Sequence, residues 1–272
     1  MTSNLRPVYC LNQPLLARLS AGVLLAAGLA LAAAGSCAAE QQAAGNTRIE
    51  SFNKAKKLLE REVYADHRVT FYCGASFDAR KNVTLPAGFT TPRHEKRAAR
   101  VEWEHVVPAE NFGRAFKEWR EGDEACVDSR GRSFKGRKCA EKVSKTYRYM
   151  QSDLYNLYPA IGAVNAMRSN YRYAMLPDMK PTFGTCAMKI DVEGRRAEPP
   201  EAARGAIART TLYMAASYPL YRLSSAQRQL MQAWDKTYPV DRWECTRARR
   251  IEAIQGNENA FVAEPCRRAG WY

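Results

Sequence analysis

A glutamate and a histidine stand side by side in the stretch VEWEHVVPAENFG, residues 101 to 113. Glu104 and His105 are residue types that phosphodiester hydrolysis needs, because a carboxylate can hold a divalent cation and a neutral imidazole can take a proton from water. Neighbours on a flat strand point to opposite faces, so the two can serve one site only where the strand twists or ends. Pro108 predicts such an end three residues later. Taken alone, the pair fits the polar end of a strand better than a catalytic site.

Other residues with the same chemistry follow further along the chain. Asparagine oxygens can complete a cation site in which several waters remain, as Mg²⁺ prefers. Arginines from the basic, irregular loop between Cys126 and Cys139 can pair with a phosphate. The segment SDLYNLYPAIGAVNAMRSNYRY, residues 152 to 173, carries the polar residues Asp153, Asn156, Asn165, Arg168 and Asn170.

The elements that must position these residues are first predicted from hydrophobic periodicity. An amphipathic helix is expected over 49–64, because its apolar residues recur at near-helical spacing. β-branched and aromatic residues predict strands over 68–74 and 99–107, with a polar loop over 78–97 between them. A short helix is expected over 110–122, closed by a glycine.

The rest of the chain is expected to be mainly helical. Residues 152–173 read as a strand-like piece that leads into a helix. Three helices follow: one that begins near the prolines of EPPEAARG, one with a serine cap at SSAQRQ, and one that ends on the glycine of RRIEAIQG. No repeat and no linker long enough to divide two domains is present. The sequence therefore predicts a mixed α+β single domain with a helical C-terminal third.

The first residues have the pattern of an export signal. Two arginines precede an apolar run over 21–34, and the small residues GSCAAE follow it. The run is shorter than the roughly 20 residues of a membrane span. We expect residues 1–38 to be a cleaved signal peptide and residues 39–48 to be a flexible start, with no stable membrane span. A lipid anchor on Cys37 is the less favoured alternative.

Cysteine usage agrees with export. Cleavage removes two of the eight cysteines and leaves an even number, which in an exported chain favours disulfides over a metal cluster. No C-x-x-C pair is present, which lowers the case for zinc further. Cys126 and Cys139 are close enough in sequence to close a local loop, whereas the other four allow three pairings. The six are Cys73, Cys126, Cys139, Cys186, Cys245 and Cys266.

The charge of the chain suits a polyanionic partner. Lys and Arg number 42 against 28 acidic residues, and loss of the leader's two arginines leaves a net charge of +12. Nucleic acid, anionic lipid and acidic polysaccharide all fit such a surface, as does a solubilising charge with no partner. Charge alone does not separate these classes.

Longer stretches favour nucleic acid. VEWEHVVPAENFG, SDLYNLYPAIGAVNAMRSN, the run from CAMKIDVEG to TTLYM, and AWDKTYPVDRWECTRARRIEAIQGNENAFV with the late Cys266 resemble, in order, the bacterial endonuclease I family. The resemblance covers roughly residues 50 to 268. It implies a periplasmic or secreted non-specific nuclease with a ββα-metal (His-Me finger) core in a domain over 49–272. The expected protein is a monomer that cleaves DNA, with RNA as an open second substrate, and leaves 5′-phosphate ends.

The same resemblance implies roles for individual residues. His105 matches the general base, Glu104 and Asn165 match the metal ligands, and the expected cation is Mg²⁺, with Mn²⁺ or Ca²⁺ as alternatives. Arg137 in GRKC matches the family arginine that steadies the phosphate. The loop here is longer than the family pattern, so Arg132 in RGRS competes for that role.

Further expectations concern five other residues of the segment 152–173 and two alternative functions. Asp153 and Asn156 are interpreted as structural residues that cap or orient the segment carrying Asn165. Arg168, Asn170 and Arg172 are candidates for contacts with nucleic acid, and surface or loop positions are the alternative for the first two. A basic exported protein that binds nucleic acid without catalysis would share the charge and the cysteines. An exported binder of anionic polysaccharide or lipid would need neither the metal nor the base.

Overall fold

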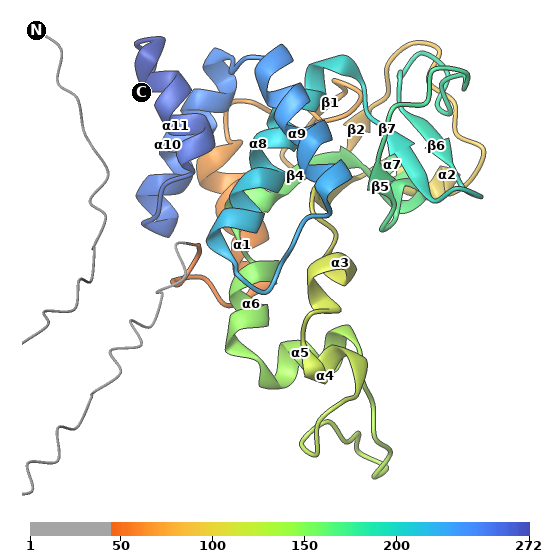
Figure 1. Cartoon of the computed structure of the whole chain (residues 1–272). Coiled ribbons are helices and arrows are strands. Elements are labelled where there is room, and N and C mark those ends of the chain that lie inside the picture. Colours follow the sequence, from red (N-terminus) through yellow and green to blue (C-terminus); the bar gives the residue numbers. More distant parts are fainter. Residues whose placement is uncertain (1–44) are drawn as a thin grey trace, which may run out of the picture. The chain divides into compact units, whose positions relative to one another are not determined.

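The computed structural model describes residues 45–272 (Figure 1). The expected signal peptide over 1–38, Cys37 within it, and residues 39–44 lie outside the described residues. Residues 45–48 are the described part of the start that was expected to be flexible. Asn46 is buried, its Oδ1 accepts from the backbone N–H groups of Arg48 and Ile49, and its amide nitrogen donates to the carbonyl of Tyr149. This part of the chain is therefore packed onto the domain.

The first helix forms where the apolar spacing predicts it. Ser51 accepts a hydrogen bond from the N–H of Lys54 and so caps α1, Phe52–Leu58. The helix continues into η1, Leu59–Val63, which is wound as a π-helix. The buried side chains of Leu59 and Val63 place this helix against the core.

The strand predicted over 68–74 is wrong. Only Val69 forms a bridge, to Ser76, and the chain then turns back. Thr70 makes this turn: its N–H donates to the carbonyl of Ala75, and its Oγ1 accepts from the N–H of Ala75. Gly74 adopts a φ of 62°, which glycine reaches without strain. Local hydrogen bonding therefore overrides the β-branched and aromatic composition of this segment.

Two antiparallel strands and a helix carry the polar residues of interest. β3, Val101–His105, is shorter than predicted and pairs with β4, Leu157–Ile161, with Glu104 opposite Tyr158 and His105 opposite Leu157. α7, Gly162–Arg168, follows β4 directly and contacts both strands. The strand-then-helix order predicted for 152–173 is thus confirmed.

Short helices fill the chain between β3 and β4 and lie together below β4 in Figure 1. The single helix predicted over 110–122 is two helices, and Gly122, at a φ of 96°, follows the second. The segments are α3 Ala109–Gly113, α4 Lys117–Arg120, α5 Arg137–Val143, α6 Lys145–Gln151 and the 3₁₀ turn η2 Leu154–Asn156.

The remaining strands form two small sheets apart from β3 and β4. The first pairs β1 with β2, and the second has the order β5-β7-β6. The short helix α2, Glu95–Ala98, lies just before β3 in the chain. The strands are β1 Ser76–Phe77, β2 Val83–Thr84, β5 Arg172–Tyr173, β6 Lys189–Asp191 and β7 Arg196–Glu198.

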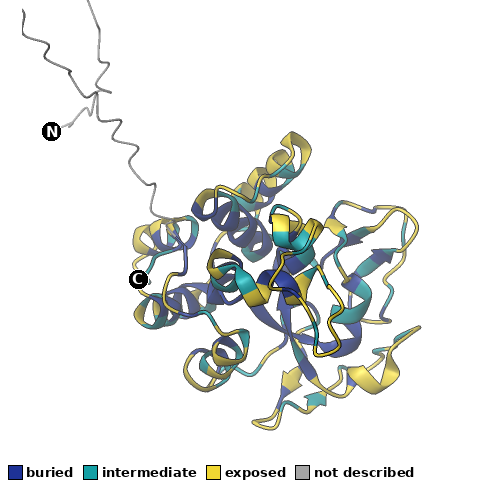
Figure 2. Cartoon of the chain, turned by 90° about the horizontal axis from the view of Figure 1, so that it is seen from below, coloured by how far each residue is buried: buried dark blue, intermediate teal, exposed yellow. Residues whose placement is uncertain are grey.

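The C-terminal third is helical, as predicted. Ser224 caps α9 by accepting from the N–H of Gln227, and Gly256 ends α10 in the left-handed conformation. Figure 2 shows the buried residues concentrated inside the domain and the exposed ones on the outer turns of the helices. The helices are α8 Glu201–Ser217, α9 Ser225–Thr237, α10 Arg242–Gln255 and α11 Ala260–Arg268. The described residues thus form an α+β fold.

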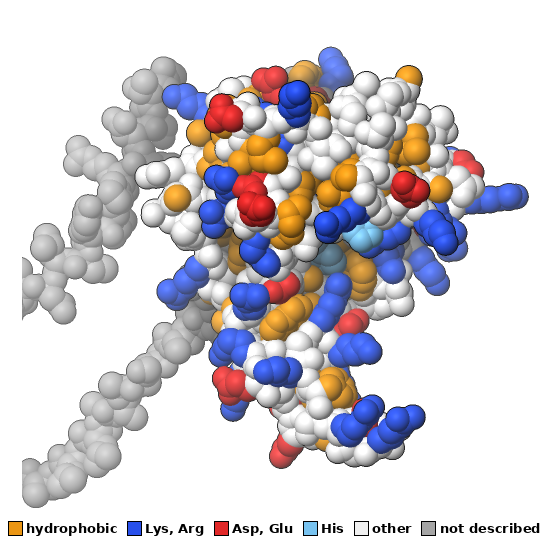
Figure 3. All heavy atoms as spheres, turned by 90° about the vertical axis from the view of Figure 1, so that its right-hand side faces the viewer, with side chains coloured by type: hydrophobic (Ala, Val, Ile, Leu, Met, Phe, Trp, Pro, Cys, Tyr) orange, Lys and Arg blue, Asp and Glu red, His pale blue; other side chains and the backbone are white. Residues whose placement is uncertain are grey.

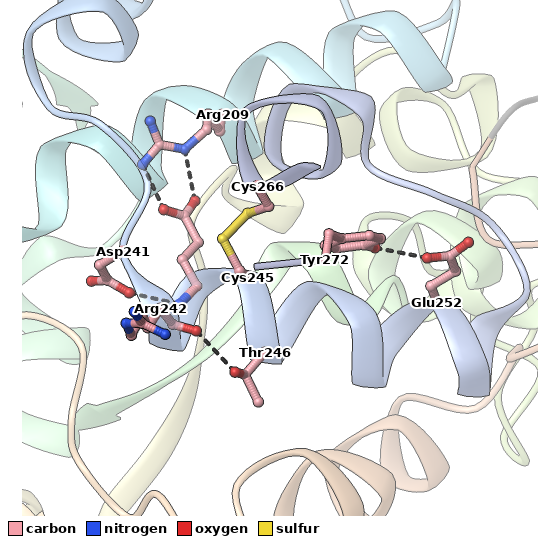
Figure 4. Close-up of a disulfide and its surroundings, with 9 residues drawn as sticks. Arg209, Asp241, Arg242, Cys245, Thr246, Glu252, Cys266 and Tyr272 are labelled. Atoms are coloured by element: carbon pink, nitrogen blue, oxygen red, sulfur yellow. Dashed lines mark hydrogen bonds and ion pairs between the residues drawn. A yellow bond between two sulfur atoms is a disulfide. The ribbon is translucent and has the colours of Figure 1, made fainter. Parts of the chain in front are cut away.

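Three disulfides form among the described residues. The predicted pair Cys126–Cys139 forms, and the other four cysteines pair as Cys73–Cys186 and Cys245–Cys266. The first of these spans 113 residues and joins the turn after Thr70 to the segment before β6. The last ties α11 to α10, beside the hydrogen bond that Tyr272 donates to Glu252 (Figure 4).

Candidate active site

One open pocket at the end of β3 brings together most of the residues that the sequence singled out. It is bordered by the aromatic ring of Phe52 and by side chains from β3, α5 and α7. β3 pairs with β4, and three consecutive residues of β3, from Trp103 to His105, border the pocket. Side chains from both faces of the strand therefore reach the same space. The predicted site residues along the pocket are Glu104, His105, Arg137, Asn165 and Asn170.

Glu104 is nearly buried, at 3 % exposure, and is held at one oxygen. Tyr72 Oη donates to its Oε1 at 2.7 Å, and Arg168 Nη1 lies 3.0 Å from the same atom. Burial raises the pKa of this carboxyl, while the Arg168 charge and the Tyr72 hydrogen bond oppose the rise. Oε2 takes part in neither contact, so it is the oxygen that can face a cation.

His105 is fixed in one tautomer by the backbone of α6. Its Nε2 lies 2.9 Å from the carbonyl oxygen of Gln151. A carbonyl only accepts, so Nε2 must carry the proton, and in the neutral ring Nδ1 is then the basic atom. Burial, followed by the nearby Arg137 charge, lowers the pKa of His105 to about 3. The imidazole is therefore neutral at physiological pH and able to accept a proton.

Asn165 reaches the pocket from the middle of α7. Its Nδ2 donates to Glu102 Oε2 at 2.8 Å, so the oxygen of the amide is the end left for a cation. Asn165 and Glu104 lie on different elements but border the same pocket. Their carboxylate and amide oxygens are of the type that could hold a hard cation.

The structure separates the two candidate arginines. Arg137 is the first residue of α5; its guanidinium lies 5.4 Å from the ring of Phe52, and its Nη2 is 3.4 Å from Gln151 Oε1. Arg132 lies in the exposed loop, where Nε donates to Asp128 Oδ2 at 2.9 Å, and it is not among the residues that line the pocket. Of the two, only Arg137 borders the pocket.

Arg168 is not a surface contact for nucleic acid, contrary to the expectation. Its side chain is 1 % exposed, and its guanidinium donates to the carbonyls of His105 and Val106 in addition to its ion pair with Glu104. An arginine engaged on three sides by the protein cannot pair with a phosphate. Its role is to hold the end of β3 against α7.

The other two contact candidates differ from each other. Asn170 borders the pocket, and its Oδ1 accepts from Arg195 Nη2 at 2.7 Å. Arg172 is exposed on β5. Neither position conflicts with a contact to nucleic acid.

Asp153 and Asn156 have internal partners only. Asp153 accepts hydrogen bonds from the hydroxyls of Tyr213 and Tyr218 and from the amide of Gln255. Asn156 pairs with the backbone of Val107 at 2.8 and 3.0 Å, just after the end of β3. Both side chains are fully buried, and their structural roles stay a prediction.

Three further residues of the site were not identified from the sequence. Tyr72 could not be predicted as a site residue because its segment has the composition of a strand. Gln151 contacts His105 through its backbone carbonyl, and the type of a side chain does not predict a backbone contact. Glu102 did carry a signal. It lies on the same face of β3 as Glu104, two residues away, and such spacing places two carboxylates side by side.

The donor set fits a cation that keeps much of its water. Within residues 45–272 no group of three or more His, Cys, Asp or Glu side chains could hold a metal ion. A closed zinc site is therefore not formed by these residues. One carboxylate and one amide oxygen are the sparse set that Mg²⁺ accepts.

The corrected role of Arg168 predicts a large effect on stability. Arg168→Met leaves Glu104 buried without its counter-charge, so the free energy of unfolding should fall by about 3–5 kcal/mol. Arg172→Met, on the exposed strand nearby, should change it by no more than about 0.5 kcal/mol. Urea unfolding with the disulfides intact measures both variants. If both variants change the free energy of unfolding by an equal, small amount, the structural role of Arg168 is contradicted.

The lowered pKa of His105 predicts a loss of stability in acid. Between pH 6.5 and about 3 the unfolded chain binds a proton at His105 that the folded protein does not, so stability falls as pH falls. From pH 6.5 to 5 the wild type should lose about 2 kcal/mol more than His105→Gln, at roughly 1.4 kcal/mol per pH unit. Urea unfolding in EDTA gives both curves. If the free energy of unfolding of wild type and His105→Gln falls equally with pH, the folded protein binds the proton at His105 as readily as the unfolded chain does.

Comparison with known proteins identifies the family. The family model described as Endonuclease I matches residues 51–266. An extracellular deoxyribonuclease of Aeromonas hydrophila is 40 % identical over 223 residues, which is 80 % of this chain and 90 % of the relative. A periplasmic deoxyribonuclease of the same species and Endonuclease-1 of Buchnera aphidicola subsp. Acyrthosiphon pisum are also 40 % identical, over 80 % of this chain and 87 % and 82 % of theirs. With a match of this length and identity, the chain belongs to the endonuclease I family and is a nuclease.

Proposed function

We propose that this protein is an exported endonuclease that hydrolyses DNA with little sequence preference, uses one divalent cation and leaves 5′-phosphate ends. One observation carries the proposal: the carbonyl of Gln151 fixes His105 with a free Nδ1, in a pocket that also holds Glu104 and Asn165. A base, a cation site and a phosphate-binding arginine are thereby within reach of one phosphodiester.

The strands β3 and β4 and the helix α7 are the proposed ββα-metal core. β3 supplies Glu104 and His105, β4 pairs with β3, and α7 supplies Asn165. The supporting observation is the order of the elements, two antiparallel strands followed directly by a helix that contacts both.

The residues divide the chemistry among them. His105 Nδ1 takes the proton from the attacking water, because Nε2 is committed to Gln151. Arg137 pairs with the phosphate, and its exposure allows it to reach a ligand. Glu104 and Asn165 would hold Mg²⁺, which when bound supplies positive charge to the phosphate and the leaving oxygen.

Substrate binding is proposed to rest on charge. On the face shown in Figure 3, Lys and Arg side chains outnumber the acidic ones. Contacts of this kind go to phosphates, which all sequences share, so we expect low sequence preference and an affinity that falls steeply with salt.

Export is supported by three observations. The first 38 residues have the pattern of a signal peptide, three disulfides form, and two of the relatives are named extracellular and periplasmic deoxyribonucleases. The described residues contain no helix that is long and apolar enough to cross a membrane. We propose a periplasmic or secreted monomer.

Digestion of plasmid DNA tests the proposed reaction. The disulfide-bonded chain from residue 39 should nick and linearise supercoiled plasmid with Mg²⁺ and leave it intact in EDTA. His105→Ala should cut about 10²–10⁴ times more slowly, because the general base is lost. Ligation of the products without prior kinase treatment checks the 5′ phosphate, and a parallel arm with RNA checks the second substrate. Intact plasmid with the wild type would refute the function, and unchanged cutting by His105→Ala would refute the base.

A second pair of variants tests the arginine assignment. Arg137→Ala should lower the turnover number about 10²–10³-fold, as expected for a donor that stabilises developing charge. Arg132→Ala removes an equal charge from the same disulfide-closed loop but should stay close to the wild-type rate. If Arg132→Ala lowers the turnover number more than Arg137→Ala does, Arg132 is the arginine that pairs with the phosphate.

A further inference from the structure

We propose that Glu102 is a positioning residue of this site: it orients the side-chain amide of Asn165 so that the oxygen, and not the nitrogen, is presented to the cation. The inference rests on the proposed function, because it takes Asn165 as a metal ligand. It assigns a task to a carboxylate that lies beside the pocket but has no part in the chemistry described above.

The first step is the hydrogen bond between the two side chains. Asn165 Nδ2 donates to Glu102 Oε2 at 2.8 Å. An ionised carboxylate has no proton to give, so it can accept only from the nitrogen end of the amide. If the amide turned over, Oδ1 would face Oε2, and two acceptors would stand together without a proton between them. Glu102 therefore selects one of the two amide orientations.

The second step is the way in which Glu102 itself is held. Arg97 Nε donates to Oε1 at 2.8 Å and Arg97 Nη2 donates to Oε2 at 2.5 Å. Both oxygens of Glu102 therefore accept from one guanidinium, and this two-pronged contact fixes the carboxylate as an acceptor.

The third step is the close approach of α7 to β3. Gly162, the first residue of α7, donates its N–H to the carbonyl of Arg100 at 2.9 Å. A Cβ at this position would lie 2.5 Å from the carbonyl oxygen of Arg97 and 2.9 Å from Glu102 Oε1. Only glycine leaves room for the helix to begin here, and Asn165 follows three residues later on the same side of the helix.

These contacts give two carboxylates on one strand face different tasks. Glu104 and Glu102 are two residues apart on β3, and Arg168 and Asn165 are three residues apart on α7. Arg168 holds Glu104 at Oε1 only, which leaves Oε2 for a cation. Both oxygens of Glu102 are already engaged, so this residue acts through Asn165 and is not itself a ligand.

Binding of Mn²⁺ to the folded, metal-free protein tests the inference without measuring activity. Glu102→Leu removes the acceptor, so the dissociation constant for Mn²⁺ should rise about 10–100-fold. Glu102→Gln keeps one acceptor oxygen for Asn165 and should fall between Glu102→Leu and wild type. The matched control is Glu50→Leu, which breaks an ion pair of similar exposure with Arg148, 2.9 Å away, outside the pocket. Calorimetric titration, on variants shown by circular dichroism to be folded, gives the constants.

A double-mutant cycle shows whether Glu102 acts through Asn165. Asn165→Ala should weaken Mn²⁺ binding, and Glu102→Leu should add little in that background, because the group it orients is gone. Additive effects, or a Glu102→Leu constant equal to that of Glu50→Leu, would overturn the positioning role. If Glu102→Leu does not fold, Glu102→Gln takes its place in the cycle. Additive effects, or a Glu102→Gln constant equal to that of Glu50→Leu, would then overturn the positioning role.

The same variants separate this inference from the proposed function. If Asn165→Ala binds Mn²⁺ as well as wild type does, the proposal that Asn165 is a metal ligand is refuted. Weaker binding by Asn165→Ala with unchanged binding by Glu102→Leu would refute only the positioning. In plasmid cleavage, Glu102→Leu should need more Mg²⁺ for half-maximal rate yet approach the wild-type rate at saturation. A structural defect would lower the rate at every Mg²⁺ concentration.

Discussion

A single buried guanidinium, that of Arg168, sets the geometry on which the pocket depends. It bonds the carbonyls of His105 and Val106 and pairs with Glu104, so it joins the last turn of α7 to the last residues of β3. Burying a charge is costly unless it is paired and hydrogen-bonded, and here the carboxylate and the two carbonyls meet that requirement. Because Asn165 is on the same helix, fixing α7 against β3 also fixes the distance between the two proposed cation ligands. Tyr72 completes the arrangement: its hydroxyl proton goes to Glu104, so the hydroxyl of Tyr173, 2.6 Å away, is the donor of that pair.

The electrostatic environment of His105 follows from the same packing. The ring lies 5.0 Å from that of Phe52 and close to the cationic groups of Arg137, Arg168 and Lys56, all of which disfavour a second proton. A base in such surroundings is neutral over a wide range of pH, although a lowered pKa also makes it a weaker proton acceptor. A bound phosphate, with its negative charge, would offset the nearby cations. The basicity of His105 would then depend on what occupies the pocket.

Much of this fold could be predicted from the sequence, for reasons that differ between elements. The C-terminal helices carry their own start and stop signals, Ser224 and Gly256 among them, and they form where those signals are. The pocket residues were predicted from motifs, and the structure places Glu104, His105, Arg137 and Asn165 around one space. The burial of Arg168 could not be predicted, because its segment is rich in polar residues and its partners are carbonyls more than 60 residues earlier. The turn at Thr70 could not be predicted from strand propensity, because it depends on two hydrogen bonds between Thr70 and Ala75 and on the left-handed conformation of Gly74. Pairing of the four remaining cysteines likewise depends on contacts that spacing does not encode.

The partners of Asp153 bear on the order in which parts of the chain can reach their final contacts. Its donors come from Tyr155, Tyr213, Tyr218 and Gln255, and the backbone N–H of Asn46 lies at 3.4 Å. During synthesis and export this carboxylate has its full set of partners only after residue 255 has emerged, about a hundred residues after the carboxylate itself. The segment that leads into β4, although it lies in the middle of the sequence, is therefore among the last to be secured. The contacts of a carboxylate that precedes β4 and α7 in the sequence thus depend on residues of the C-terminal third.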